Sequence, residues 1–373
     1  MPILRPPPPI RMGPVVVAIP ARDEAAEIGP CLLALARQTA RIDCVVLCLN
    51  NCRDDTAAVV KAHASELNFP LHVMELTLPQ PRANAGQARR IAMNKAAILA
   101  GHDGVLLTTD ADARVSPGWV AANLTALESG AEVVAGRAVI EPEGAKAIPA
   151  HLHAIDTREC AYATLLDEIY ALVDPDPADP WPRHDEESGA SIAATVTAYD
   201  RVGGMPAVTL GEDRAFFDVL RRYDTRIRHA PDVSVIVSAR TEGRACGGMA
   251  DTMRRRIERP DPFLDERLEP AAAGLRRARL RRLLRGLWST PDQAALPSSA
   301  RLGLDLARLT ELLKAPHFGA AWAAAEMTSP ALKHRARIPL EDLEVQTDRA
   351  LRIRNWLRRE AGQAGIAIRV AAE

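Results

Sequence analysis

Aromatic residues are scarce in this sequence, and neither sign of charge predominates. Phe, Trp and Tyr together make up 4% of the 373 residues, so a surface that stacks rings on nucleic-acid bases is not expected. The 47 basic and 48 acidic side chains leave a formal net charge of −1. A strongly basic chain would favour a nucleic-acid partner, and this nearly neutral one does not.

Long apolar runs are also missing. No stretch of about 18 apolar residues occurs, so the sequence predicts no membrane-spanning helix. Residues 1–13 are rich in proline and lack an apolar segment before a cleavage site. They indicate a stiff, disordered leader rather than a signal peptide. We therefore expect a cytoplasmic protein.

The six cysteines are not spaced as metal ligands usually are. No Cys-x-x-Cys pair occurs, and no histidine lies within ten residues of the cluster between Cys31 and Cys52. Cys44 and Cys48 would share one face of a strand. We expect these thiols to be small buried hydrophobes.

Apolar runs alternate with helical patterns through the first part of the chain. The runs predict buried strands at residues 15–19, 44–49, 71–76 and 104–108. Between them, apolar residues at 3.6-residue spacing predict helices, one of them over 86–99. This alternation predicts an α/β fold, with a mostly parallel sheet flanked by helices.

Three different patterns follow. Residues 151–173 predict a helix, and the acidic, proline-rich stretch 174–187 predicts a loop over a site. Residues 191–198 and 233–237 predict later strands. The sequence thus predicts three parts, which are the leader at 1–13, an α/β domain at 14–246 and a helical C-terminal region at 247–373.

Asp110 and Asp112 follow the strand predicted at 104–108. The carboxyl edge of a parallel sheet is where open α/β sheets bind ligands. Residues i and i+2 of an extended segment point to the same side, so both carboxylates can approach one hard cation. Such an ion can stabilise a diphosphate leaving group. The alternative is a solvated acidic turn.

Five short motifs follow one another along the chain. They are Pro20-Ala21-Arg22-Asp23-Glu24, the polar turn ending in Asp54-Asp55-Thr56, Gly86-Gln87-Ala88-Arg89, Asp110-Ala111-Asp112 and Gly211-Glu212-Asp213. In this order and spacing, about residues 14–240 resemble the family 2 nucleotide-sugar glycosyltransferases, which have a Rossmann-like GT-A fold. Part of the pattern resembles the glucosyl- and mannosyl-(phospho)glycerate synthases within that family.

The resemblance implies a donor site. Pro20, Arg22 and Glu24 match the first nucleotide-contacting loop, and Arg89 matches an arginine that contacts the nucleotide. Asn50 stands where many relatives have an acidic residue that reads the base, and its amide can still form a hydrogen bond to a base edge.

The resemblance also implies a metal site. Asp110 would lie near the donor ribose and a divalent metal, Mn²⁺ or Mg²⁺. Asp112 would be the more direct ligand. The nearest histidine to the family's third ligand is His229, and no third ligand is assigned.

Asp213 matches the family's general base, which takes the acceptor hydroxyl proton as the hydroxyl attacks the sugar. Glu212 would contact the acceptor. An acidic pair after a glycine also suits a helix N-terminus, which is the structural alternative. A base at Asp213 implies inversion, whereas the glycerate-glycosylating relatives retain configuration, so the stereochemistry stays open.

The implied activity is a hexosyltransferase reaction from a nucleoside diphosphate sugar to an unidentified hydroxyl acceptor. The alternative is a catalytically degenerate GT-A scaffold or a regulatory nucleotide-binding protein. The glycine-rich fingerprints of dinucleotide-binding enzymes and of P-loop nucleotidases do not occur in the sequence.

Arginines mark two further regions. Arg240 and Arg244 follow the last predicted strand and suit either an anionic acceptor or phosphate, or a surface charge role. A basic amphipathic stripe lies in the C-terminal region. Its arginines are Arg276, Arg277, Arg279, Arg281, Arg282 and Arg285. The stripe suits either peripheral contact with the inner membrane face or packing on its own domain, and a homodimer through this region also stays open.

Overall fold

The computed structural model describes residues 12–240, 243, 248–259, 261–291 and 296–370, so most of the predicted leader, and Arg244, lie outside the described residues. The chain forms two compact units. The first comprises residues up to Ile148, with Glu186–Leu220 and Thr225–Arg255; the second comprises Pro149–Asp185, Arg221–Asp224 and residues from Arg256 onward. The predicted domain limits at 14–246 and 247–373 stay a prediction.

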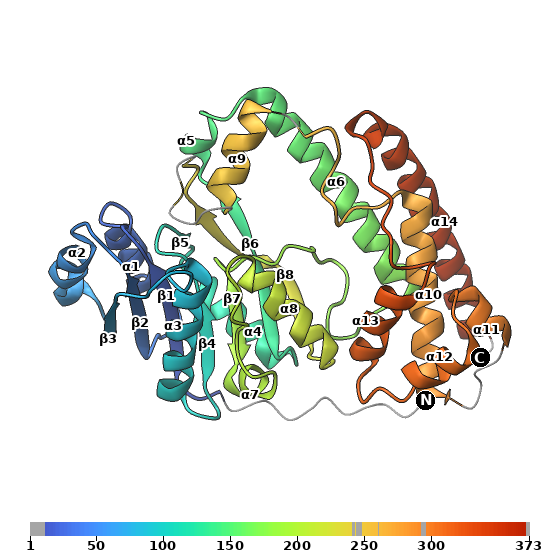
Figure 1. Ribbon diagram of the computed structural model, residues 1–373, viewed down its shortest axis with the longest axis horizontal. Coiled ribbons are helices and arrows are strands. Elements are labelled where there is room, and N and C mark those ends of the chain that lie inside the picture. The colour runs from blue at the N-terminus through green and yellow to red at the C-terminus, as the bar shows by residue number, and fades with distance from the viewer. Residues whose placement is uncertain (1–11, 241–242, 244–247, 260, 292–295, 371–373) are drawn as a thin grey trace. The chain divides into compact units, whose positions relative to one another are not determined.

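The first unit contains an eight-stranded sheet (Figure 1). Its strands are β1 (Val15–Ala21), β2 (Cys44–Asn50), β3 (Leu71–Leu76), β4 (Val105–Thr108), β5 (Arg114–Val115), β6 (Val133–Ile140), β7 (Ile192–Thr195) and β8 (Ile227–Val237), in the spatial order β3-β2-β1-β4-β7-β6-β8-β5. Strands β1 to β4 are parallel to one another. Strand β7 runs antiparallel between β4 and β6, and β5 runs antiparallel to β8. The predicted α/β class, with a mostly parallel sheet, is confirmed.

Helices cover both faces of this sheet. The helices between Val15 and Glu258, α6 apart, are α1 (Ile28–Ala36), α2 (Thr56–His63), α3 (Ala85–Ala100), α4 (Trp119–Glu128), α5 (Pro142–Ala145), α7 (Val196–Arg201), α8 (Glu212–Arg222) and α9 (Met249–Glu258), with a 3₁₀ turn η1 at Ala64–Glu66. Side chains of α1, α2 and α4 pack on one face, and side chains of α3, α7 and α8 pack on the other. Both faces are therefore dry, which explains the continuous apolar runs in β1, β2 and β4.

Several strands differ from the prediction, among them β8, which begins at Ile227 rather than at residue 233. Residues 196–198 were expected to continue a strand, but the strand ends at Thr195, whose side chain caps α7 by accepting a hydrogen bond from the backbone N–H of Ala198 at 3.2 Å. Strand β6 has no counterpart among the predicted strands. Its second half alternates exposed and half-buried residues, so the sequence lacks the unbroken apolar run that marks the central strands.

The second unit is helical, as predicted for the C-terminal region. Its helices are α6 (Ala150–Val173), α10 (Ala271–Ser289), α11 (Leu296–Arg301), α12 (Leu306–Leu312), α13 (Phe318–Thr328) and α14 (Leu343–Val370), with a 3₁₀ turn η3 at Leu340–Asp342. Helices α6, α10 and α14 pack side by side around one apolar core (Figure 1), and α10, α12 and α13 share another. Within the described ranges, none of the helices is long and apolar enough to cross a membrane.

The arginine stripe of α10 packs largely within its own unit. Arg277 is buried, and its guanidinium donates to Glu269 at 2.9 Å and to Glu326 at 3.0 Å. Arg281 and Arg285 both form ion pairs with the buried carboxylate of Asp174. These contacts agree with the alternative that the stripe packs on its own domain. Peripheral membrane contact stays a prediction.

Burial of the central strands on both faces has a direct test. Val46 and Leu47 are fully buried on opposite faces of β2, so Val46→Asp and Leu47→Asp each place an unpaired carboxylate in a dry core, at a cost of several kcal/mol. We expect neither variant to fold. Val73→Asp on the edge strand β3, where the side chain is 40% exposed, should change stability by less than about 1 kcal/mol. Circular dichroism and thermal unfolding distinguish the three; a folded Val46→Asp or Leu47→Asp protein would contradict the two-layer burial.

Candidate active site

The carboxyl ends of β1 and β4 form the edge that carries the predicted site. Strand β1 pairs in parallel with both β2 and β4, and Ala18 lies opposite Thr108. The turn after β1, which holds Glu24, and the turn after β4, which holds Asp110 and Asp112, therefore leave the sheet at the same edge. This is the edge at which open α/β sheets bind ligands.

Two residues with left-handed backbone shape the neighbouring turns. Asp23 has φ 54° and Asn51 has φ 57°, a conformation that Asp and Asn tolerate better than other non-glycine residues. Asp23 Oδ1 accepts a hydrogen bond from the Arg53 N–H at 2.6 Å. The Asn51 side chain forms hydrogen bonds to both backbone groups of Leu78, at 3.0 and 3.1 Å. The turns after β1 and β2 are thus tied to each other and to the loop after β3.

Arg89, on α3, is a buried guanidinium that joins four segments. Its Nη2 donates to Asp110 Oδ1 at 2.5 Å and its Nε donates to Glu212 Oε1 at 3.0 Å. Its Nη1 donates to the Thr108 hydroxyl at 2.9 Å and to the Gly189 carbonyl at 2.8 Å. All three nitrogens of the side chain therefore have protein partners, and Arg89 fixes the position of Asp110.

Glu212 and Asp213 begin α8, as the helix-start alternative predicts. Glu212 is buried against Arg89. Asp213 Oδ2 accepts a hydrogen bond from the Gly189 N–H at 3.0 Å, and its Oδ1 accepts one from the Arg214 N–H at 2.8 Å. Gly189 thus links Asp213 to Arg89, and Arg89 in turn contacts Asp110.

A second arginine bridges two more carboxylates of the same edge. Arg240 Nη1 donates to Glu24 Oε2 at 2.7 Å and Nη2 donates to Glu24 Oε1 at 2.5 Å. The same Nη2 lies 3.0 Å from Asp112 Oδ2. Two guanidinium groups therefore hold Glu24, Asp110 and Asp112 at one edge of the sheet. Glu24 lies far from the two aspartates in the sequence.

The charges of this edge fit a divalent cation. The two arginine networks hold four carboxylates against two guanidinium groups, so negative charge is in excess. Burial, together with Asp110 and Glu24, raises the pKa of Asp112 to about 6 in spite of the opposing pull of Arg240. A cation of charge two would relieve this repulsion, and carboxylate oxygens are the ligands that Mg²⁺ and Mn²⁺ prefer.

The remaining predicted donor-site residues lie nearby but in a separate network. Pro20 is buried within β1 and pairs in register with Cys48. Arg22 Nη1 donates to the Ala83 carbonyl at 3.3 Å, and Asn50 Nδ2 donates to the Asn84 carbonyl at 3.2 Å. Both side chains therefore contact the segment before α3.

Asn50 has an unusual feature. It is 1% exposed, and its side-chain oxygen has no hydrogen-bond partner among the described residues. A buried acceptor left in this state costs free energy, so a donor group brought by a ligand would stabilise it.

The contacts of Arg240 could not be predicted from the sequence. No local pattern reveals them, because its partner Glu24 is 216 positions away in the sequence. Gly189 suits a close backbone approach or an ordinary turn, and the structure shows the close approach, since an added Cβ would lie 2.8 Å from the Arg89 guanidinium.

Cys31 and Cys48 are buried as expected, whereas Cys44 and Cys52 are half-buried and Cys160 is exposed. Burial raises the pKa of Cys48 to about 12 and also raises the pKa of Cys31. Cys52 lies with Asp23 and Asp54 in a group whose ligand atoms are within 4.8 Å of one another. Both carboxylates accept backbone hydrogen bonds from the adjacent turns, so we interpret this group as turn structure.

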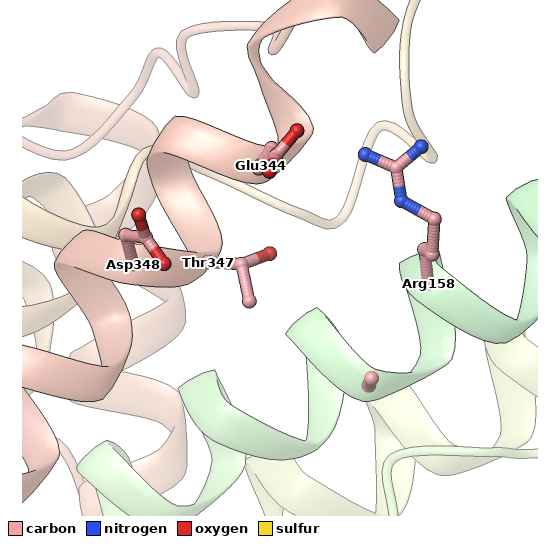
Figure 2. Close-up of a pocket in the computed structure, with 5 residues that line it drawn as sticks. Arg158, Glu344, Thr347 and Asp348 are labelled. Atoms are coloured by element: carbon pink, nitrogen blue, oxygen red, sulfur yellow. The ribbon is translucent and has the colours of Figure 1, made fainter.

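A separate hollow lies in the second unit between α6 and α14. Figure 2 shows Arg158 on α6 across from Glu344, Thr347 and Asp348 on α14. Its charged side chains are exposed, and none of the predicted site residues lines it. The hollow is therefore not the predicted site.

The close approach of Gly189 to Arg89 has a testable consequence. Gly189→Ala pushes a methyl group against the buried guanidinium, which must move away from Asp110 and Glu212. We expect a loss of about 1–3 kcal/mol in the free energy of unfolding. Gly118→Ala is the matched control, because an added Cβ there meets nothing within 4 Å. Chemical denaturation measures both; equal stabilities would show that Arg89 adapts freely.

The raised pKa of Asp112 predicts a pH-dependent stability. The pKa of about 6 in the folded chain exceeds the unfolded value of about 3.9, so ionised Asp112 costs stability above pH 6, and that cost disappears as the pH falls toward 4. In EDTA, the stability of Asp112→Asn relative to wild type should therefore increase by on the order of 2–3 kcal/mol from pH 4.5 to pH 8. Urea denaturation across this range tests the prediction, and a difference that is constant or reversed in sign would contradict it.

The model of glycosyl transferase family 2 matches residues 16–174. No curated protein is similar enough in sequence to match the chain.

Several solved structures are similar to the chain. S. aureus TarS in complex with UDP-GlcNAc is 15% identical, over 93% of this chain and 92% of its own, with a TM-score of 0.46. Mannosyltransferase PcManGT from Pyrobaculum calidifontis, in complex with GDP-Man and Mn²⁺, is 18% identical over 96% and 87%, with a TM-score of 0.40. Glucosyl-3-phosphoglycerate synthase from Mycobacterium tuberculosis, with Mn²⁺, UDP and phosphoglyceric acid, is 14% identical over 66% and 76%, with a TM-score of 0.39.

The family model spans β1, β4 and the turn that carries Asp110 and Asp112, and it ends before α8 and Arg240. The motif order in the sequence, the carboxylate edge and this match agree. Residues 16–174, which make up less than half of the chain, are thus similar to glycosyl transferase family 2.

Proposed function

We propose that this protein transfers a hexose from a nucleoside diphosphate sugar to a hydroxyl acceptor, with the help of a divalent metal. The family match supports sugar transfer. The observation that carries the finer proposal is the gathering of Glu24, Asp110 and Asp112 at one sheet edge with an excess of negative charge. We assign the activity to the domain predicted at residues 14–246.

Asp112 and Asp110 would hold the metal, Mn²⁺ or Mg²⁺. Bound there, the ion supplies Lewis-acid stabilisation of the diphosphate leaving group. Asp112 is the better ligand of the two, because the buried Arg89 holds one oxygen of Asp110 at 2.5 Å, whereas the partly exposed Arg240 lies farther from Asp112, at 3.0 Å. Arg89 is then a positioning residue, which fixes the rotamer of Asp110 from a buried site rather than contacting the nucleotide through a free nitrogen.

Arg22 and Asn50 would contact the nucleotide itself, together with the turn that begins at Pro20. The support is local: both side chains contact the segment before α3, and the buried Asn50 oxygen has no partner among the described residues. A base that offers an N–H to this oxygen would satisfy it.

Asp213 is the candidate general base. Its carboxylate is half-buried and is oriented by hydrogen bonds from the backbone N–H groups of Gly189 and Arg214. In the proposed reaction it accepts the acceptor hydroxyl proton as the oxygen attacks the anomeric carbon. Glu212, buried on Arg89, would support this arrangement from the adjacent position.

Calorimetric titration tests the donor site. UDP, GDP, ADP and dTDP are each titrated, with and without Mn²⁺, into wild type and Asp112→Ala. We expect one nucleotide to bind, and to require both the ion and Asp112, because the ion joins the carboxylates to the diphosphate. If none of the four binds in a metal-dependent way, the degenerate scaffold becomes the better account.

The role of Asp213 is tested separately. Asp213→Asn keeps the shape and the acceptor oxygen of the side chain but cannot take a proton. Turnover of the donor identified above should fall by roughly 10²- to 10⁴-fold, with nucleotide affinity unchanged. Donor affinity that collapsed along with turnover would move Asp213 into the nucleotide site.

A further inference from the structure

Arg240 reaches the carboxylate edge by way of strand pairing. Strand β5 follows Asp112 directly, and it pairs antiparallel with β8, with Arg114 opposite Ile236 and Val115 opposite Val235. Continuing this register beyond the two strands brings the residues after β8 alongside the turn that holds Asp110 and Asp112. The backbone thus delivers Arg240 to the edge from the opposite end of the first unit's sequence.

The Arg240 guanidinium occupies a position between two carboxylates that a bound metal cation could also occupy. Its fork takes both oxygens of Glu24, and one of the same nitrogens takes Asp112 at 3.0 Å. The two carboxylates are largely withdrawn from water, with side-chain exposures of 7% and 17%, while the arginine is 27% exposed. The Arg240 guanidinium therefore neutralises the charge of two carboxylates that are less exposed to solvent than it is.

A divalent ion on Asp112 and this guanidinium would compete. Both are positive, and both need the oxygens that face the same point of the edge, so they repel each other at short range. Arg89 is not expected to be displaced in this way, because its guanidinium is buried and has four hydrogen-bond partners. Of the two arginines, Arg240 is the one with few partners to lose and some access to solvent.

We propose that Arg240 is an exchangeable counterion, which holds Glu24 and Asp112 while the divalent ion is absent and is displaced when that ion binds. The proposal rests on the proposed role of Asp112 as a metal ligand. Its consequence is that the carboxylates stay assembled in the empty site, and that metal binding releases a guanidinium fork suited to a phosphate or carboxylate group.

The opposing account makes Arg240 a fixed clamp that shapes the metal site. The two accounts predict opposite signs for one measurement. If Arg240 competes, its removal should tighten metal binding, whereas if it shapes the site, its removal should weaken metal binding.

The experiment measures the affinity of Mn²⁺ alone, by electron paramagnetic resonance of the free ion, for the full chain and its variants. Arg240→Gln should bind Mn²⁺ about tenfold more tightly than wild type, because one positive charge leaves the cluster. Arg240→Lys, which keeps the charge but loses the fork, should lie between them. Arg114→Gln is the matched control: Arg114 also bridges two carboxylates, Glu27 and Glu141, and its removal should change Mn²⁺ affinity by less than about threefold.

A second readout follows the side chain itself. Phenylglyoxal modification, located by mass spectrometry, should be slow at Arg240 in EDTA and faster when Mn²⁺ is present, while the rate at Arg114 stays the same. This measurement needs no variant, so it stands even if Arg240→Gln does not fold.

The outcomes separate this inference from the proposed function. If neither wild type nor Arg240→Gln binds Mn²⁺, the metal site itself is wrong. If Mn²⁺ binds to wild type and is lost in Asp112→Ala, but Arg240→Gln binds it no more tightly and the modification rate of Arg240 does not change, the metal site stands and the exchange is overturned.

Discussion

The buried guanidinium of Arg89 is the interaction on which the rest of the site depends. It joins the N-terminal half of α3 to the end of β4, the loop before β7 and the start of α8, through Asp110, Gly189 and Glu212. Such a buried charge is tolerated only because its partners satisfy it, and removing one of them would leave an uncompensated ion. This constraint explains why Gly189 must be small and why Glu212 remains buried. It also connects the proposed metal-binding side of the edge to the candidate base, since the Gly189 N–H donates to Asp213.

Much of the fold could be predicted from the sequence, for a clear physical reason. Strands β1, β2 and β4 are covered on both faces, so their apolar runs are continuous, and their limits agree with the predicted ones to within about two residues. The pairing of the later strands could not be predicted in this way. Strand β7 enters antiparallel between β4 and β6, and β5 has only two residues. Such pairings depend on tertiary contacts rather than on any local pattern.

The candidate site divides along the same line. Asp110 and Asp112 could be found from their place after a strand, and Asp213 from its place in a motif. The contacts of Arg240 could not, since they join residues 216 positions apart and depend on the β5–β8 pairing. The arginine stripe of α10 also could not be interpreted from the sequence alone. Its amphipathic pattern suits a membrane surface, yet Arg277, Arg281 and Arg285 have carboxylate partners within their own unit.

We propose above that the edge formed by Glu24, Asp110 and Asp112 is a divalent cation site. A crystal structure of the full chain grown with Mn²⁺, with diffraction recorded near the manganese absorption edge, would locate the ion. We expect an anomalous peak within coordination distance of an Asp112 carboxylate oxygen, with the Arg240 guanidinium turned away from it. An anomalous map without a peak at this edge, or a peak bound elsewhere while Arg240 keeps its contacts with Glu24 and Asp112, would contradict it.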